Sequence, residues 1–92
     1  MSNNKGEEVR RRRLYFRSAH RGSKELDLIL GPFAARYLDT FDDMQLEKYE
    51  RILETSDPEL YNWLVGRVPV PDADKSDVLE LLLAFDAAQK IP

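Results

Sequence analysis

The residues best suited to chemistry lie together where a basic segment meets an apolar one. Residues 21–27 read Arg-Gly-Ser-Lys-Glu-Leu-Asp, and they place Arg21 four positions before Glu25. Gly22 lies beside the arginine and can adopt backbone angles that other residues avoid. A small domain that carries charged groups on a tight turn is better suited to presenting them to a partner than to catalysis. We therefore interpret this segment as a binding surface.

Metal and nucleophile chemistry have little support. The chain has one histidine, His20, and no cysteine, so a zinc site would need carboxylates for nearly all its ligands. His20 could act as a base for Ser18 or Ser23, but no third group is spaced to orient its ring. We expect a surface histidine at a helix end, no metal site and no catalytic residue, so the protein is not predicted to be an enzyme.

Two further kinds of site are also disfavoured. The four glycines are too far apart for a phosphate-binding loop, so we expect no cofactor of the chain's own. Glu25 and Asp27 are two positions apart, so on a helix they point to different sides and would not share an acid–base site. Their simpler role is to stabilise a helix N-terminus. Arg21 and Glu25 also have a simpler possible role, which is a local ion pair across the turn.

The charge of the chain is strongly asymmetric. Residues 1–24 hold eight basic and two acidic side chains, a net of +6, whereas residues 25–92 hold six basic and fifteen acidic ones, a net of −9. The basic end either docks within the fold or offers a positive surface to an anionic partner. Residues 10–13 are all arginine and precede Tyr15, Phe16 and Arg17, a combination that can bind phosphates and stack on bases. A small nucleic-acid-binding regulator is therefore the alternative function, although the acidic remainder would repel a phosphate backbone.

Length and composition indicate one soluble domain. The 92 residues are 42% hydrophobic and 34% charged, as in globular proteins. The apolar stretch at residues 78–85 is too short to cross a bilayer, and the basic N-terminus does not resemble a secretory signal. The absence of cysteine suits a reducing compartment. We expect a cytoplasmic protein without membrane insertion that is a monomer when free.

Apolar residues recur at helical spacing throughout, which predicts an all-α fold. We expect a small single-domain five-helix bundle with short connections over residues 1–92, with residues 1–6 disordered and residues 7–90 folded. The first helix is expected at residues 7–19. Apolar stripes should form the core of the other four: Leu26, Ile29, Leu30, Phe33 and Tyr37; Leu46, Tyr49, Ile52 and Leu53; Leu60, Trp63 and Leu64; and Val78, Leu81, Leu82 and Phe85.

Polar and special residues predict where these helices begin and end. Ser23, Thr40 and Asp57 are the expected N-caps of the second, third and fourth helices, and the fifth should begin near Asp74 or Ser76. Pro58 suits the first position of the fourth helix, and Gly66 should end it. Gly31-Pro32 interrupts the second helix, where the proline predicts a kink or a break.

Two segments together resemble a known family. Arg21-Gly22-Ser23-Lys24-Glu25-Leu26-Asp27 is similar to the R-G-x-x-E-x-D signature of the FAD assembly factors of succinate dehydrogenase, the SdhE-type flavinylation factors. Asp57-Pro58-Glu59-Leu60-Tyr61-Asn62-Trp63-Leu64 is similar to their D-P-x-L-x-x-W-L segment. Pro32-Phe33 and residues 40–43 also match family positions, and the resemblance covers roughly residues 8–88. The RGxxE motif alone is weak, but the two segments at this separation are fairly specific.

The resemblance implies a five-helix assembly chaperone that assists covalent attachment of FAD to the flavoprotein subunit of succinate dehydrogenase. It implies the related subunit of fumarate reductase as a further client in some organisms. The flavoprotein would form its own bond to FAD, and the chaperone would have no catalytic role. The residues expected to contact the client or support that contact are Arg17, His20, Arg21, Gly22, Glu25 and Asp27. The family usually has arginine or lysine where this chain has His20, which makes the charge at this position depend on pH.

Overall fold

The computed structural model describes residues 5–89, apart from the side chain of Lys5. The chain divides into two compact units between Asp42 and Asp43. The first contains α1 (Lys5–Ala19), α2 (Lys24–Tyr37) and the short 3-10 helix η1 (Leu38–Thr40). The second contains α3 (Asp43–Leu53), α4 (Asp57–Leu64), the 3-10 helix η2 (Asp72–Asp74) and α5 (Asp77–Gln89).

The predicted all-α fold is confirmed: residues 5–89 contain five α-helices and no strand. Over the same residues no helix is long and apolar enough to span a membrane. Disorder was predicted for residues 1–6. Residues 1–4 lie outside the described part of the chain, whereas Lys5 and Gly6 belong to α1. Residue 90, the predicted end of the folded part, also lies outside it.

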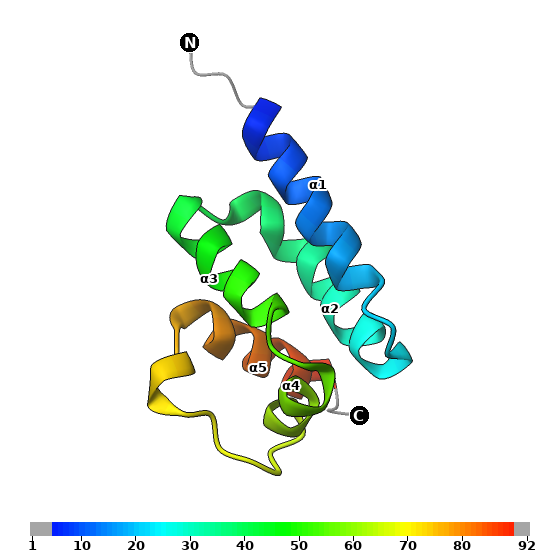
Figure 1. Cartoon of the computed structure of the whole chain (residues 1–92), viewed down its shortest axis with the longest axis vertical. Coiled ribbons are helices and arrows are strands. Elements are labelled where there is room, and N and C mark those ends of the chain that lie inside the picture. Colours follow the sequence, from blue (N-terminus) through cyan, green and yellow to red (C-terminus); the bar gives the residue numbers. More distant parts are fainter. Residues whose placement is uncertain (1–4, 90–92) are drawn as a thin grey trace. The chain divides into compact units, whose positions relative to one another are not determined.

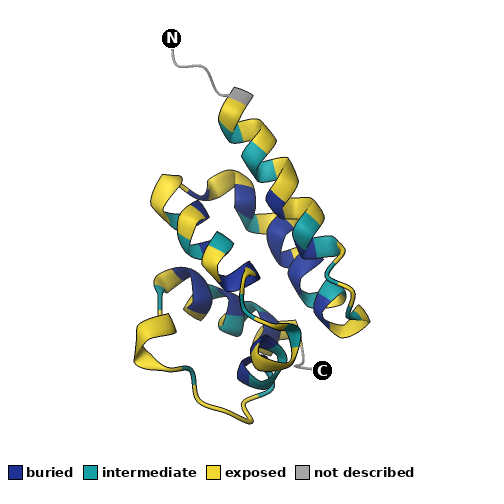
Figure 2. Ribbon diagram, viewed as in Figure 1, coloured by how far each residue is buried: buried dark blue, intermediate teal, exposed yellow. Residues whose placement is uncertain are grey.

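The first unit is a helical hairpin in which α1 and α2 lie side by side (Figure 1). Their buried residues face one another across the pair (Figure 2). From α1 these are Leu14 and Ser18, and from α2 they include Leu26, Leu30 and Phe33. The buried Ser18 hydroxyl donates to the carbonyl of Leu14 at 2.7 Å, so it is satisfied within its own helix. Ile29 and Tyr37, which were expected in the same stripe, are only half-buried.

Arg11 ties α1 to the end of this hairpin. Its Nε donates to the carbonyl of Leu38 at 2.9 Å, and its Nη2 donates to the carbonyl of Phe41 at 2.7 Å. Its Nη1 also pairs with the Glu7 carboxylate at 3.2 Å. One guanidinium thus satisfies two carbonyls where the chain leaves η1, a charge-assisted arrangement that suits the planar fork of arginine.

Of the kink or break predicted at Gly31-Pro32, the break is wrong, because α2 runs without interruption from Lys24 to Tyr37. Proline normally disfavours a helical residue before it, partly through a clash with the Cβ of that residue. Gly31 has no Cβ, which lowers this cost. Gly31 is also buried against α1, where a Cβ would lie 3.8 Å from both Cα and Cβ of Ala19. A Cβ at this distance would make ordinary van der Waals contact, so the glycine serves mainly the proline that follows it.

The predicted cap at Thr40 is also wrong. Thr40 belongs to η1, its hydroxyl donates to the carbonyl of Tyr37 at 2.7 Å, and α3 begins only at Asp43. Threonine hydroxyls bond readily to a carbonyl three residues earlier, and this local option competed with the capping role.

In the second unit the predicted core residues of α3 and α4 are all buried, including Trp63 as the anchor of a short helix. In α5, Val78 and Leu82 are buried as expected, whereas Leu81 and Phe85 are half-buried and Leu79, which was not predicted, is buried.

Helix termini in this unit follow capping rules with one shift. The cap of α4 is Ser56 and not Asp57, since the Ser56 hydroxyl accepts the N–H of Glu59 at 3.4 Å. Gly66, with a φ of 79°, ends α4 as predicted. Its N–H donates to the carbonyl of Trp63, and the N–H of Arg67 donates to the carbonyl of Asn62. Ser76 is confirmed at the start of α5, where its hydroxyl accepts the N–H of Leu79 at 3.0 Å.

We expect Arg11→Met to destabilise the protein by about 1–3 kcal/mol. The substitution removes the charged donor and leaves the carbonyls of Leu38 and Phe41 without the hydrogen bonds that it makes. Arg12→Met is the matched control, since the neighbouring Arg12 is exposed and makes no ion pair in the described part of the chain. Urea unfolding followed by circular dichroism measures both. Equal stability of the two variants would contradict the role given to Arg11.

The ion pair between Lys48 of α3 and Asp77 of α5, at 2.9 Å, should make stability depend on acidity. The hydrogen bond from Lys48 lowers the pKa of Asp77 below its usual 3.8. Because the folded-state pKa is the lower one, this contribution is present above pH 3.8 and disappears as the pH falls through the lowered value.

Asp77→Asn should therefore be less stable than the parent protein at neutral pH, and the difference should shrink on acidification below pH 3.8. Urea unfolding at a series of pH values tests this. A difference that stays constant down to the lowest pH would show that the ion pair is not its source.

Candidate functional site

The predicted binding segment forms the turn between α1 and α2, which we call the hairpin turn (residues 20–23). It is closed by Asp27, whose Oδ1 accepts the backbone N–H of Arg21 at 2.6 Å. The N–H of Asp27 itself donates to the carbonyl of Ser23 at 2.9 Å. One residue in α2 thus binds both sides of the turn. Leu26, just before it, is fully buried and anchors the start of α2.

Gly22 provides the backbone geometry that the turn requires. Its φ is 96°, a value that residues with a side chain rarely adopt. The residue is exposed, and a Cβ placed on it would have no atom within 4 Å. The glycine is therefore required by conformation and not by crowding inside the molecule, and the space above it is open to a partner.

The structure places Arg21 and Glu25 where a partner could reach them. Glu25 is exposed and Arg21 is half-buried, so neither is enclosed within the fold. Ser23 stands at the N-cap position of α2, as predicted. The capping bond expected from its hydroxyl is absent, so that part of the prediction is wrong. The hydroxyl donates instead to Oε1 of Glu25 at 3.2 Å, which steadies the carboxylate at the surface.

Because Ser23 does not cap the helix, the first turn of α2 keeps unused donors. The N–H groups of Lys24, Glu25 and Leu26 have no acceptor among residues 5–89. The first N–H groups of a helix point outward along its axis and attract negative charge or carbonyl oxygens. The hairpin turn and the adjoining first turn of α2 therefore combine an arginine, a carboxylate and backbone donors.

His20 and Arg17 flank the turn on its α1 side. His20 is exposed, as predicted for a surface histidine at a helix end, and Arg17 is half-buried. The His20 ring lies 4.4 Å from the ring of Phe16, centroid to centroid. Phe16 is 63% exposed, and it was not among the residues predicted to contact a partner protein. Its place beside the turn follows from the four-residue spacing to His20.

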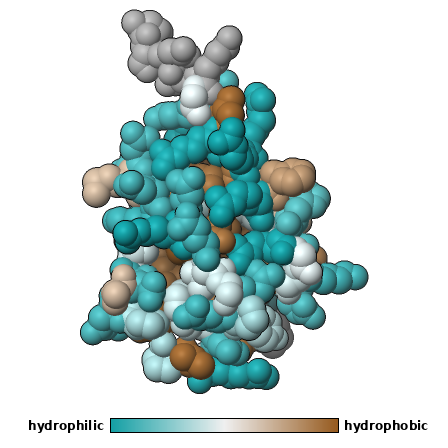
Figure 3. Space-filling view, viewed as in Figure 1, coloured by the Kyte–Doolittle hydropathy of each residue, from teal (hydrophilic) through white to brown (hydrophobic). Residues whose placement is uncertain are grey.

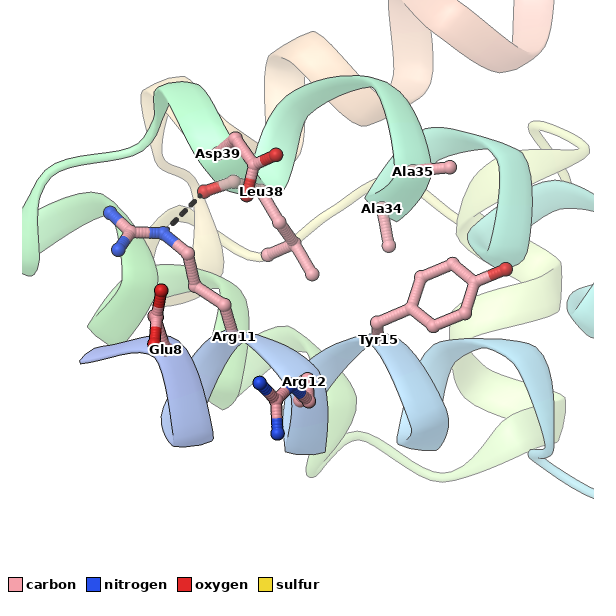
Figure 4. A pocket seen from close by; sticks show the side chains of 8 residues that line it. All are labelled: Glu8, Arg11, Arg12, Tyr15, Ala34, Ala35, Leu38 and Asp39. Atoms are coloured by element: carbon pink, nitrogen blue, oxygen red, sulfur yellow. Dashed lines mark hydrogen bonds between the residues drawn. The ribbon is translucent and has the colours of Figure 1, made fainter. Parts of the chain in front are cut away.

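A shallow cavity of about 350 Å³ lies between α1 and the end of α2. Figure 4 shows the Tyr15 ring beside Ala34 and Ala35, and the Arg11 side chain reaching across to Leu38. Since Arg11 is held by the fold, the run of four arginines is not one continuous ligand-binding surface. The cavity walls carry both arginines and acids, so it has no clear preference for an anion.

The described residues contain no group of acidic and histidine side chains that could hold a metal ion. On the face drawn in Figure 3 the surface is mostly hydrophilic, with apolar side chains in separate spots.

Asp27→Ala should destabilise the protein by about 1 kcal/mol, because it removes the bond that closes the turn, as loss of a helix-capping side chain does. Glu25→Ala, which removes a nearby carboxylate that is exposed, should change the free energy of unfolding by less than about 0.5 kcal/mol. Urea unfolding of the two variants side by side measures the difference. A larger loss for Glu25→Ala would show that Glu25, and not Asp27, holds the turn.

Comparison with known proteins identifies relatives of this chain. Residues 12–86 match the sequence profile of the family described as flavinator of succinate dehydrogenase. The FAD assembly factor SdhE of Acetobacter pasteurianus is 43% identical over 75 residues, which cover 82% of this chain and 69% of that protein.

Two yeast proteins named succinate dehydrogenase assembly factor 2, mitochondrial, match as well. The one from Debaryomyces hansenii is 37% identical over 90% of this chain and 61% of its own length. The one from Komagataella phaffii is 40% identical over 91% of this chain and 46% of its own length. The chain thus spans less than two thirds of these two relatives. The profile match and the identities agree with the resemblance carried by the two sequence segments, and the chain belongs to the family of succinate dehydrogenase flavinators.

Proposed function

We propose that this protein is an assembly factor that promotes covalent attachment of FAD to the flavoprotein subunit of succinate dehydrogenase. It binds that subunit through the hairpin turn and the adjoining start of α2, with Arg21, Gly22 and Glu25 in contact. The observation that carries this proposal is the open space over Gly22, since an exposed glycine with φ of 96° lets a second backbone approach closely. Membership of the flavinator family supports the choice of this client.

The chemistry of the turn supports a protein partner. The Arg21 guanidinium can donate to a carboxylate or a backbone carbonyl of the client, and the Glu25 carboxylate can accept from a basic group. The unused N–H groups of Lys24 and Glu25 add donors that need no side chain. Asp27 acts inside the turn, so we propose that its part in binding is to keep the other groups in place.

The protein then acts by positioning and not by covalent chemistry. Binding would hold the flavoprotein in a conformation that keeps its flavin and its acceptor side chain close together, which accelerates a reaction by proximity. No residue of this chain enters the reacting bond in this proposal, and it needs no cofactor of its own. We further propose that the free protein is a monomer in the cytoplasm and that the related subunit of fumarate reductase is a second client.

No observation favours the nucleic-acid alternative. It needs the arginines of residues 10–13 as a set, and Arg11 is bound to carbonyls of its own unit.

Gly22→Ala should strongly reduce FAD attachment to the client while leaving the protein folded, because the added methyl group stands where the client backbone must approach. The control is Gly66→Ala, a glycine with φ of 79° that also has open space around it. Both substitutions impose a similar backbone strain of about 1–2 kcal/mol. A loss of FAD attachment seen only with Gly22→Ala therefore reflects the lost client contact and not lower stability.

The assay is the covalent flavin fluorescence of the succinate dehydrogenase flavoprotein in a denaturing gel, after co-expression with each variant. We expect fluorescence close to background with Gly22→Ala and close to normal with Gly66→Ala. Glu25→Ala should act like the former and Glu54→Ala, an exposed acid of the second unit, like the latter. Normal fluorescence with both Gly22→Ala and Glu25→Ala would overturn the proposed binding surface.

A further inference from the structure

We infer that the client-binding surface extends from the hairpin turn along the outward side of α1, where it receives an acidic patch of the same flavoprotein. This inference rests on the proposed function. We call this side the outer α1 face and define it by Val9, Arg13, Phe16 and His20.

The four residues share one side because of their spacing. They follow one another at intervals of four, three and four, which keeps side chains aligned along a helix. The buried residues of α1, Leu14 and Ser18, point to the opposite side. The outer α1 face is therefore the side that α2 does not cover.

The apolar centre of this face is Phe16. Its side chain is 63% exposed, and Val9, two turns earlier, is 47% exposed. An aromatic ring left in water gains by burial, and aromatic residues together with arginine are enriched among those that dominate protein interfaces. The Phe16 ring also contacts His20, which precedes Arg21 and Gly22, so the face continues directly into the hairpin turn.

The charge around Phe16 selects the kind of partner. Residues 9–24 include seven basic side chains and no acidic one. Among these, Arg12 and Arg13 lie one turn before Phe16, are exposed and have no partner in the described part of the chain. Arg17 is half-buried and likewise has none there. An apolar ring bordered by cations without partners fits a hydrophobic depression bordered by carboxylates.

A flavoprotein surface fits this face better than nucleic acid does. Arg11, in the middle of the basic run, is occupied by the carbonyls of Leu38 and Phe41. This removes a group that a phosphate backbone would use. It leaves the outer α1 face, to which Arg11 does not belong, intact for a protein.

The experiment measures binding of the purified flavoprotein subunit of succinate dehydrogenase, prepared without FAD, by calorimetry or surface plasmon resonance. Phe16→Ala should raise the Kd about ten- to a hundredfold. Alanine is the best helix former, so α1 should remain folded. Met44→Ala is the control, because Met44 of α3 is 65% exposed and lies outside both α1 and the turn. It should leave the Kd unchanged.

Charge is tested in the same assay. Arg13→Glu should weaken binding about tenfold or more at low salt, with a smaller difference at high salt. Arg51→Glu makes the same change at an exposed arginine of α3 that has no partner among residues 5–89, and it should have little effect.

The outcomes separate this inference from the proposed function. If Gly22→Ala prevents binding while Phe16→Ala and Arg13→Glu bind normally, the outer α1 face is not part of the surface, although the function stands. If the parent protein does not bind the flavoprotein, the proposed function itself fails. The inference is also overturned if Phe16→Ala changes only self-association in ultracentrifugation, or if Arg13→Glu changes only binding to a labelled DNA or RNA duplex.

Discussion

The hydrogen bond between the Asp27 carboxylate and the backbone N–H of Arg21, at 2.6 Å, is the constraint on which the candidate site depends. It joins the end of one helix to the start of the next across only four residues. The turn can be this short because Gly22 takes a positive φ. Together these two features fix the backbone that carries Arg21 and leads to Glu25, and neither side chain is fully buried. Binding then requires little further ordering of the chain, which favours affinity.

Arginine has two distinct roles in the first unit. Arg11 is part of the fold, because it satisfies carbonyls at residues 38 and 41. Arg12 and Arg13 remain at the surface and carry the positive potential of α1. Potentials of this kind raise the rate at which oppositely charged surfaces meet and help to exclude wrong partners. An assembly factor must find one flavoprotein and later release it, and rapid, salt-sensitive association suits that cycle.

Much of the fold could be predicted from sequence, because apolar spacing and glycine positions are local signals. The buried stripes of α3 and α4 and the end of α4 at Gly66 follow from them directly. Capping was less predictable, since Ser23, Thr40 and Ser56 each offer a hydroxyl with several bonding choices. Thr40 bonded backward to Tyr37, Ser23 bonded to Glu25, and only Ser56 capped its helix. The continuous helix through Pro32 was missed because the proline was weighed without the residue before it: Gly31 has no Cβ, which lowers the cost of a helical residue at that position.

The candidate site was predictable in part for the same reason. Gly22 and its charged neighbours stand out in the sequence, and the family motif is the basis for the client contact proposed for them. The closing role of Asp27 and the place of Phe16 beside His20 required the structure, because both depend on how the chain turns after Ala19. The long-range bonds of Arg11, across 27 and 30 residues, had no sequence signal apart from its place in a basic run.

The most direct test of the central claim is hydrogen–deuterium exchange of this protein with and without the flavoprotein subunit of succinate dehydrogenase. The N–H groups of Lys24, Glu25 and Leu26 have no acceptor among the described residues and should exchange quickly in the free protein. We expect the peptide that contains residues 20–26 to become strongly protected in the complex. Protection confined to residues 43–89, with unchanged exchange at the hairpin turn, would contradict the account.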